Sequence, residues 1–369
     1  MSRYDTRSAR FREEIPWGPG GESAILAGVN TTLKPLRIGS LTIEFPVVLA
    51  ALAGYSDLPY RLICRSLGAP FATTEVMIDR FLLQEGKLRK HLLRSDPADH
   101  PVGGQIMGSD PGTMAQAAVI LRDLGFDVID LNFACPVRKV VSRHRGGFMM
   151  SQPEQTLDVI RAVREAVPGH PLMLKLRRSF ALDDQRCEAL WTIVRGAYEA
   201  GVDAVCLHTR AVEQMYRGEA DWRLLRAIRE AFPGRTLIGS GDVRTPADAL
   251  RMIAETGVDG VSAARGAIGN PWFFRQVREL AAGLPVSSPS LAEQRAVMER
   301  HYALATEQYG ERKGTFQMRH FGISYGRVHP HPKQIRMAFV SVRNAAEWKA
   351  VLDAHYSDSG TAAASGARP

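Results

Sequence analysis

The chain has few cysteines, and no two of them are closely spaced. The four cysteines among its 369 residues are Cys64, Cys135, Cys187 and Cys206. Structural zinc sites and small disulfide-rich domains need paired or closely spaced cysteines, so this scattering argues against both classes. We therefore expect no metal site and a reducing, cytoplasmic compartment.

Long apolar segments are missing as well. Residues 1–21 mix Arg, Asp and Glu without the apolar core of a secretory signal. No uncharged apolar run approaches the length that spans a bilayer, so we expect no membrane partner. The excess of 47 Lys and Arg over 39 Asp and Glu, a formal charge of +8, is compatible with a polyanionic partner. Many enzymes that act on small molecules are equally basic, so the charge alone does not show whether the partner is a nucleic acid.

What the sequence does contain is a regular alternation of short apolar runs and amphipathic segments. Eight runs predict strands, at residues 45–52, 71–77, 102–107, 127–133, 172–176, 204–208, 236–240 and 260–264. Helices are predicted between several of them, at residues 111–124, 153–167, 184–200, 222–231 and 246–255. This alternation predicts an α/β fold, a (β/α)8 TIM barrel. An open doubly wound sheet would favour a Gly-x-Gly-x-x-Gly turn after the first strand, and Ala53–Leu58 does not fit that turn.

Four regions follow from this pattern. Residues 1–34 are a polar N-terminal extension, and residues 35–284 form the barrel. Residues 285–356 are a small helical domain, with helices at 290–309, 316–325 and 344–355 and a break at His329–Pro332. Residues 357–369 are a tail rich in Gly, Ala and Ser, which predicts disorder.

The stretch Val128–Met150 is the most informative one. A buried strand ends at Cys135-Pro136, because proline cannot donate to a strand ladder. A cationic loop with Arg138, Lys139, Arg143 and Arg145 follows. A lone cysteine is usually a small core residue, but a thiol, an amide and cations at one strand end also suit a site for an anionic ligand.

Polar residues recur at the other predicted strand ends, where TIM-barrel enzymes carry their chemistry. They are Glu75, Gln105, Asn132, Lys175, Arg177, His208, Arg210, Ser240, Asp242 and Arg265. Structural alternatives remain open: an ion pair of Lys175 with Glu75 or Asp130, a core hydrogen bond for His208 and a backbone cap for Gln105. The last two strand ends, Gly239–Asp242 and Arg265-Gly266, predict a phosphate site. With Lys175 deeper in the barrel, this circle of polar strand ends suits a phosphorylated planar heterocycle. Among such cofactors, FMN fits best.

The chain resembles the dihydrouridine synthases, FMN enzymes that reduce uridine in RNA. The matching motifs lie within residues 38–274: Ala53-Gly54-Tyr55-Ser56-Asp57, Gln105–Ser109, Asp130–Pro136 with Lys139-Val140, Lys175-Leu176-Arg177, His208-Thr209-Arg210, Gly241-Asp242-Val243 and Ala264–Trp272. The helical region resembles the RNA-binding C-terminal domain of that family more weakly, through Met318-Arg319-His320 and Tyr325-Gly326.

The resemblance implies roles for individual residues. FMN would be held by Ala51, Leu52, Ala53, Gln105, Lys175, His208, Ser240, Gly241, Asp242, Ala264 and Arg265. Cys135 would be the proton donor, and the substrate would be bound by Asn132, Lys139, Arg177 and Arg210. Phosphates of the RNA would be contacted by Arg143, Arg145 and the segment 312–336 with Lys313, Arg319, Arg327 and Lys333.

The reaction expected from this resemblance is reduction of specific uridines in tRNA to 5,6-dihydrouridine. NADPH, or NADH, would reduce the flavin, whose N5 passes hydride to uracil C6 while Cys135 protonates C5. An ordinary thiol pKa suits such an acid at neutral pH. We expect a monomer with tRNA as its partner. Two alternatives are a flavin-dependent dehydrogenase of free pyrimidines, of the dihydroorotate or dihydropyrimidine type, and a non-catalytic RNA-binding barrel.

Overall fold

Eight parallel strands form a closed barrel in the computed structural model, which describes residues 33–357. In chain order they are β3 (Val47–Leu49), β4 (Ala72–Thr73), β6 (Val102–Met107), β7 (Val128–Asn132), β8 (Leu172–Arg177), β9 (Ala204–His208), β10 (Thr236–Ser240) and β11 (Gly260–Ala263). Each strand pairs with its neighbour in the chain, except that β4 and the short β5 (Met77–Ile78) both pair with β6, β4 at its start and β5 at its end. Pairing of β11 with β3 closes the ring. The predicted TIM barrel is confirmed.

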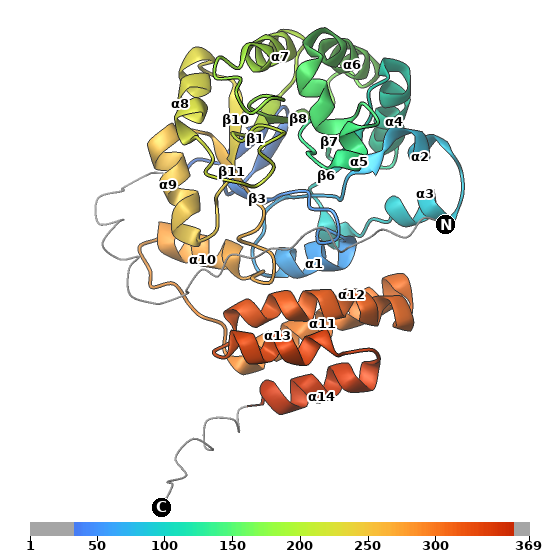
Figure 1. Ribbon diagram of the computed structural model, residues 1–369, viewed down its shortest axis with the longest axis vertical. Helices are drawn as coiled ribbons and strands as arrows, with labels where there is room; N and C mark the ends of the chain where they lie inside the picture. Colours follow the sequence, from blue (N-terminus) through green and yellow to red (C-terminus); the bar gives the residue numbers. More distant parts are fainter. Residues whose placement is uncertain (1–32, 358–369) are drawn as a thin grey trace, which may run out of the picture. The chain divides into compact units, whose positions relative to one another are not determined.

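Helices surround the strands (Figure 1). The main ones are α1 (Leu58–Ser66), α4 (Pro111–Asp123), α6 (Pro153–Ala166), α7 (Glu188–Glu199), α8 (Trp222–Ala231), α9 (Pro246–Thr256) and α10 (Phe273–Ala281). Shorter helical segments are α2 (Asp79–Leu83), α3 (Lys87–Leu92), α5 (Arg138–Val141) and the 3-10 turns at Pro97–Asp99 and Gly146–Ser151. The predicted helix start at Thr245 and Pro246 has a clear physical cause: Thr245 and Asp248 form a reciprocal capping box at the amino terminus of α9.

A β-hairpin precedes the barrel, and we did not predict it from the sequence. Its strands are β1 (Leu36–Ile38) and β2 (Leu41–Ile43), which pair in antiparallel register. Leu36, Ile38 and Ile43 are buried in one core cluster with residues from the first positions of several barrel strands, such as Val128 and Ala204. The hairpin therefore packs against the amino-terminal end of the barrel, opposite the end where the polar residues lie.

The C-terminal region, as far as residue 357, contains four α-helices: α11 (Leu291–Tyr309), α12 (Glu311–Tyr325), α13 (Pro332–Val340) and α14 (Ala345–His355). A 3-10 turn at Gly326–Val328 follows α12. The sequence had not predicted α13, and α12 begins five residues before the predicted start at Phe316. Gly314 explains why the start of α12 was predicted too late. A glycine inside a helix lowers helix propensity, but here a Cβ would lie 2.8 Å from the Cα of Thr306 on α11, so glycine permits close packing of the two helices.

The helical region is joined to the barrel by polar contacts. The Tyr309 hydroxyl donates to Asp57, 2.8 Å away, and Gln317 donates to the carbonyl of Gly54 at 3.1 Å. The predicted N-terminal extension (1–34) and the tail (357–369) fall almost entirely outside the described residues. Within residues 33–357, no helix combines the length and apolar character needed to cross a membrane.

Candidate active site at the carboxyl ends of the strands

The turn after β7 is built around the side chain of Asn132. Its Oδ1 accepts hydrogen bonds from the backbone N–H groups of Ala134 and Cys135, both at 3.0 Å. Its Nδ2 donates to Oε1 of Gln105 on the neighbouring strand at 2.7 Å. Asn132 therefore fixes the backbone that carries Cys135, and one N–H of its amide remains for another acceptor.

The same network continues one strand position deeper. Gln105 Nε2 donates to Oδ2 of Asp130 at 2.6 Å. Burial raises the pKa of Asp130 to about 6, although the hydrogen bond from Gln105 and the charge of Lys175 lower it. Among the described residues, Oδ1 of Asp130 has no hydrogen-bond partner. Gln105 thus connects two side chains inside the barrel, instead of capping a backbone group.

Lys175 lies opposite Asn132 in the β7–β8 register. Its Nζ is 3.0 Å from the Sγ of Cys206, and within residues 33–357 it forms no ion pair with Glu75 or Asp130. Lys175 is also the only residue of β8 with partial solvent exposure. The Lys175 side chain therefore keeps some access to solvent, although its Nζ contacts the buried Cys206.

Cys135 is partly buried beside the same mouth. Burial raises the pKa of its thiol, although a backbone hydrogen bond from Val137 and the charge of Arg177 act against this. The thiol is therefore un-ionised at neutral pH. Gly146 packs directly against it: a Cβ there would lie 2.9 Å from the Cβ of Cys135 and from the Sδ of Met107.

The cations that follow Cys135 do not surround its sulfur. Residues 138–141, predicted to be part of a loop, form the short helix α5. Arg138, Lys139 and Arg143 are exposed on this segment, whereas Arg145 is half-buried. The segment thus presents positive charge to solvent next to the barrel mouth, and its predicted contacts with RNA stay a prediction.

Arg177 is buried and uses its donors within the protein. Nε donates to the carbonyl of Ala134 at 2.9 Å, and Nη1 donates to the carbonyls of Ala211 and Met215 at 2.9 and 2.7 Å. The guanidinium thus ties the cysteine turn to the loop after β9. These hydrogen bonds indicate that Arg177 positions the two loops. The contact with substrate that we predicted for Arg177 is not tested by them.

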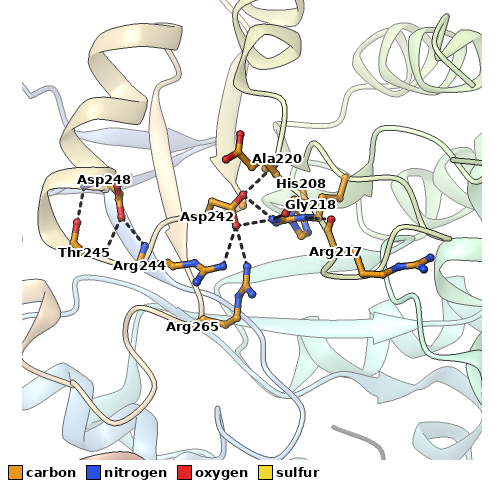
Figure 2. Close-up of polar contacts among 12 residues, drawn as sticks. His208, Arg217, Gly218, Ala220, Asp242, Arg244, Thr245, Asp248 and Arg265 are labelled. Carbon is orange, nitrogen blue, oxygen red and sulfur yellow. Dashed lines mark hydrogen bonds and ion pairs between the residues drawn. The ribbon is translucent and has the colours of Figure 1, made fainter. Parts of the chain in front are cut away.

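Three arginines converge on Asp242 where β9, β10 and β11 end (Figure 2). Arg210, whose side chain is 0% exposed, donates to both carboxylate oxygens at 2.8 and 2.7 Å. Arg265 donates to Oδ1 at 3.1 Å, and an Arg244 nitrogen is 3.9 Å from it. Burial alone would raise the pKa of Asp242, but the hydrogen bonds from Arg210 and Ala220 and the arginine charges lower it. The cluster keeps an excess of positive charge, which suits a phosphate.

His208 lies beside this cluster, with Nε2 3.3 Å from Nη1 of Arg210. Burial lowers the pKa of His208 well below its ordinary value, and the neighbouring cations lower it further. The imidazole is therefore neutral at physiological pH. One ring nitrogen can accept and the other can donate a hydrogen bond.

The remaining predicted site residues also lie at strand ends. Ala51 and Leu52 are half-buried after β3, Ala53 is exposed, and Ala264 is half-buried after β11. Ser240 is buried and its hydroxyl donates to the carbonyl of Ser262 at 3.4 Å. Gly241 follows it in the left-handed region, with φ +109°. Except for Leu52, these residues are small and leave room for a flat ligand to approach the backbone.

Sequence reasoning missed Tyr216. It lies in the loop after β9, 46% exposed, and its ring is 5.7 Å from the guanidinium carbon of Arg177 and 5.4 Å from that of Arg265. Tyr216 thus links the cysteine turn to the arginine cluster. Only the neighbouring Arg210 marked this loop in the sequence, and an arginine does not indicate an aromatic bridge.

These residues fit a phosphorylated flavin. Lys175 and His208 reach solvent at the open end, the arginine cluster offers a phosphate site, and Asp130 Oδ1 and Thr209 Oγ1 are buried without partners within residues 33–357. Over the same residues, no group of three or more His, Cys, Asp or Glu side chains is placed to hold a metal ion. The three arginines around Asp242 favour a ligand with an anionic group.

Comparison with known proteins identifies relatives across most of the chain. The family described as "Dihydrouridine synthase (Dus)" matches residues 48–360. "tRNA-dihydrouridine synthase B" of Proteus vulgaris is 30% identical over 325 residues, which cover 87% of this chain and 98% of the relative. The protein of the same name from Xanthomonas campestris pv. campestris is 34% identical, covering 88% and 96%. "Probable tRNA-dihydrouridine synthase" of Mycobacterium tuberculosis (strain H37Rv) is 30% identical, covering 86% and 84%.

Solved structures share the fold at low sequence identity. A 2-naphthoyl-CoA reductase complex matches with a TM-score of 0.54 and 13% identity, over 68% of this chain and 52% of that one. Histamine dehydrogenase from Rhizobium sp. 4-9 matches with a TM-score of 0.53 and 17% identity, over 73% and 50%. This chain spans about half the length of these two proteins.

Proposed function

Because this chain belongs to the dihydrouridine synthase family, we propose that it reduces specific uridines of tRNA to 5,6-dihydrouridine with FMN and NADPH. The protein is an oxidoreductase of this family. The observation that carries the proposal is the Cys135 thiol, which burial keeps un-ionised on the turn that Asn132 holds after β7. We further propose that the enzyme acts as a monomer in the cytoplasm.

FMN would be held along the ring of strand ends. Arg265, Ser240 and Gly241 would bind its phosphate, and Asp242 would keep the arginines in place. Lys175 would lie near the ring system, where its ammonium offsets negative charge. Residues 51–53, Gln105, His208 and Ala264 would complete the site. When bound, the flavin supplies the hydride that adds to C6 of the uracil.

Cys135 would supply the proton. Its un-ionised thiol donates to C5 of the uracil, and the resulting thiolate is stabilised by the charge of the nearby Arg177. Because Cys135 is partly exposed, solvent can return the proton after product leaves. Asn132 holds the cysteine backbone through its Oδ1 and has one amide N–H left for a uracil carbonyl.

The target base must leave the RNA stack to reach Cys135, because the thiol is partly buried at the end of a barrel strand. Residues 35–284 would form the catalytic domain and residues 285–356 an RNA-binding domain. The exposed cations Arg138, Lys139 and Arg143 would contact RNA phosphates near the mouth. Binding should then weaken steeply as salt concentration rises.

Substrate choice tests this proposal. Purified protein, FMN and NADPH are incubated with an unmodified tRNA transcript or with free uracil or orotate. Mass spectrometry measures dihydrouridine in nuclease digests of the tRNA and the reduced free pyrimidines in the other reactions. We expect product in the tRNA only. Turnover of free pyrimidines without product in tRNA would favour the dehydrogenase alternative, and no flavin binding at all would favour a non-catalytic barrel.

A further inference from the structure

Helix α12 presents an exposed aromatic side chain close to the barrel rim. Phe316 is 59% exposed, although burial of a phenylalanine is normally favourable. The guanidinium carbon of Arg319, three residues along the helix, is 4.6 Å from the centre of its ring. The cation covers one side of the ring, and the exposed fraction leaves ring surface open to another planar group.

The position of α12 relative to the rim is fixed by direct bonds. Gln317 donates to the carbonyl of Gly54, and Nε2 of His320 is 2.9 Å from the hydroxyl of Tyr55. Gly54 and Tyr55 follow β3 at the carboxyl end of the barrel. Phe316 and His320 are four residues apart and so share one face of the helix. The aromatic side chain therefore stands one helical turn from a rim contact.

The buried face of α12 explains why Phe316 cannot turn inward. Met318, Phe321 and Tyr325 are buried on that face, and a Cβ at Gly322 would lie 2.5 Å from the ring of Phe339 on α13. The helix is thus closely packed on its inner side. Phe316 stays on the outer side together with the exposed Arg312 and Lys313.

The charge around Phe316 is positive and not neutralised nearby. Within residues 33–357, no carboxylate forms an ion pair with Arg312, Lys313 or Arg319. An exposed aromatic ring among unpaired cations complements a single-stranded nucleic acid, whose bases stack on the ring while its phosphates meet the cations. A protein partner with an apolar helix would not use these charges.

We propose that Phe316, backed by Arg319, stacks an unpaired nucleobase of the RNA substrate beside the barrel mouth and so positions the neighbouring uridine. This inference rests on the proposed function, because it assumes that RNA is the substrate. Phe316 would thus position the substrate from outside the set of strand-end residues that forms the candidate active site. Lys313 would contact the adjoining phosphate.

The test compares Phe316→Ala, Phe316→Trp and, as a matched control, Met337→Ala, an exposed apolar residue (69%) on α13. For dihydrouridine formation in a tRNA transcript, we expect Phe316→Ala to raise KM about tenfold, the size of one lost stacking contact. kcat and the rate of NADPH oxidation without RNA should stay within about twofold of wild type by the same reasoning. Phe316→Trp should keep the wild-type KM, and so should Met337→Ala.

A binding experiment separates this inference from the proposed function, because it needs no catalysis. Phe316→Ala should weaken binding of tRNA and of a 12-nucleotide single strand about tenfold, with an unchanged salt slope and unchanged binding of a fully paired duplex. Lys313→Gln should instead reduce the salt slope by about 1. The inference would be overturned if Phe316→Ala bound the single strand as tightly as wild type. It would also be overturned if Met337→Ala lost as much affinity, or if light scattering showed that Phe316→Ala changes the molecular mass, which would identify Phe316 as a contact between two copies of the chain. Absence of dihydrouridine with intact, Phe316-dependent binding would refute only the proposed reaction.

Discussion

Replacing Asp242 with asparagine is expected to destabilise the protein, because it removes the only carboxylate that Arg210 contacts within residues 33–357. Arg210 is 0% exposed, and both oxygens of Asp242 accept hydrogen bonds from it at 2.8 and 2.7 Å. Asparagine keeps the size of the side chain and one acceptor oxygen. It also tolerates the left-handed backbone at this position, φ +55°. The variant therefore removes the charge and one of the two acceptor oxygens, and keeps the size and backbone of the residue.

The magnitude follows from burial. Removing one partner of a buried ion pair costs about 3–5 kcal/mol. Asp242 itself is 22% exposed and the variant retains one acceptor, so we expect the lower end, about 3 kcal/mol. The matched control is Asp158→Asn, which breaks the pair of Asp158 with Arg161, where the side chains are 61% and 56% exposed. That loss should stay below about 1 kcal/mol.

The assay is urea-induced unfolding followed by circular dichroism, on protein freed of flavin so that ligand binding does not add stability. The pKa of Asp242 is lowered in the folded protein. Its stabilising contribution is therefore fully present above the unfolded pKa, about 3.9, and is lost as pH falls through the folded pKa. The difference between wild type and Asp242→Asn should shrink below about pH 4. Equal stability of the two Asp→Asn variants at pH 7, or a difference that persists at pH 2, would refute the reasoning.

Two further predictions concern a buried carboxyl and the cysteine turn. Burial, together with the charge of Glu75, raises the pKa of Asp57 to about 7, so wild-type stability should fall as pH rises from about 4 to about 7, by an amount on the order of 4 kcal/mol. Asp57→Asn should flatten this fall in urea titrations, and an unchanged pH profile would contradict the assignment. Gly146→Ala places a Cβ 2.9 Å from that of Cys135 at φ +57°, and should cost about 1–2 kcal/mol of stability. It should also slow dihydrouridine formation at saturating tRNA, and a wild-type kcat would show that Cys135 tolerates displacement.

Much of the barrel was predictable because each strand is a short apolar run of its own. The predicted bounds of β6, β9 and β10 match the structure residue for residue. The hairpin β1–β2 was missed since each strand has only three residues, too few for a periodic pattern. Helix α13 was missed because the histidines and prolines before it read as a break, although Pro332 stands at its first turn, where proline is tolerated.

The candidate site was predictable as a set of positions and much less as a set of contacts. Residues at strand ends converge in any closed parallel barrel, so Gln105 and Lys175 could be placed from the sequence. The convergence of arginines from three different loops on Asp242 depends on long-range packing that no local pattern encodes. The same holds for Tyr216, whose two arginine neighbours come from β8 and from the loop after β11.

The measurement that tests the central claim most directly is dihydrouridine formation in a tRNA transcript by Cys135→Ala. If Cys135 supplies the proton, the variant should bind FMN and oxidise NADPH at the wild-type rate but form dihydrouridine at least about 100-fold more slowly, the usual contribution of a general acid. Dihydrouridine formation at the wild-type rate by Cys135→Ala would contradict the account.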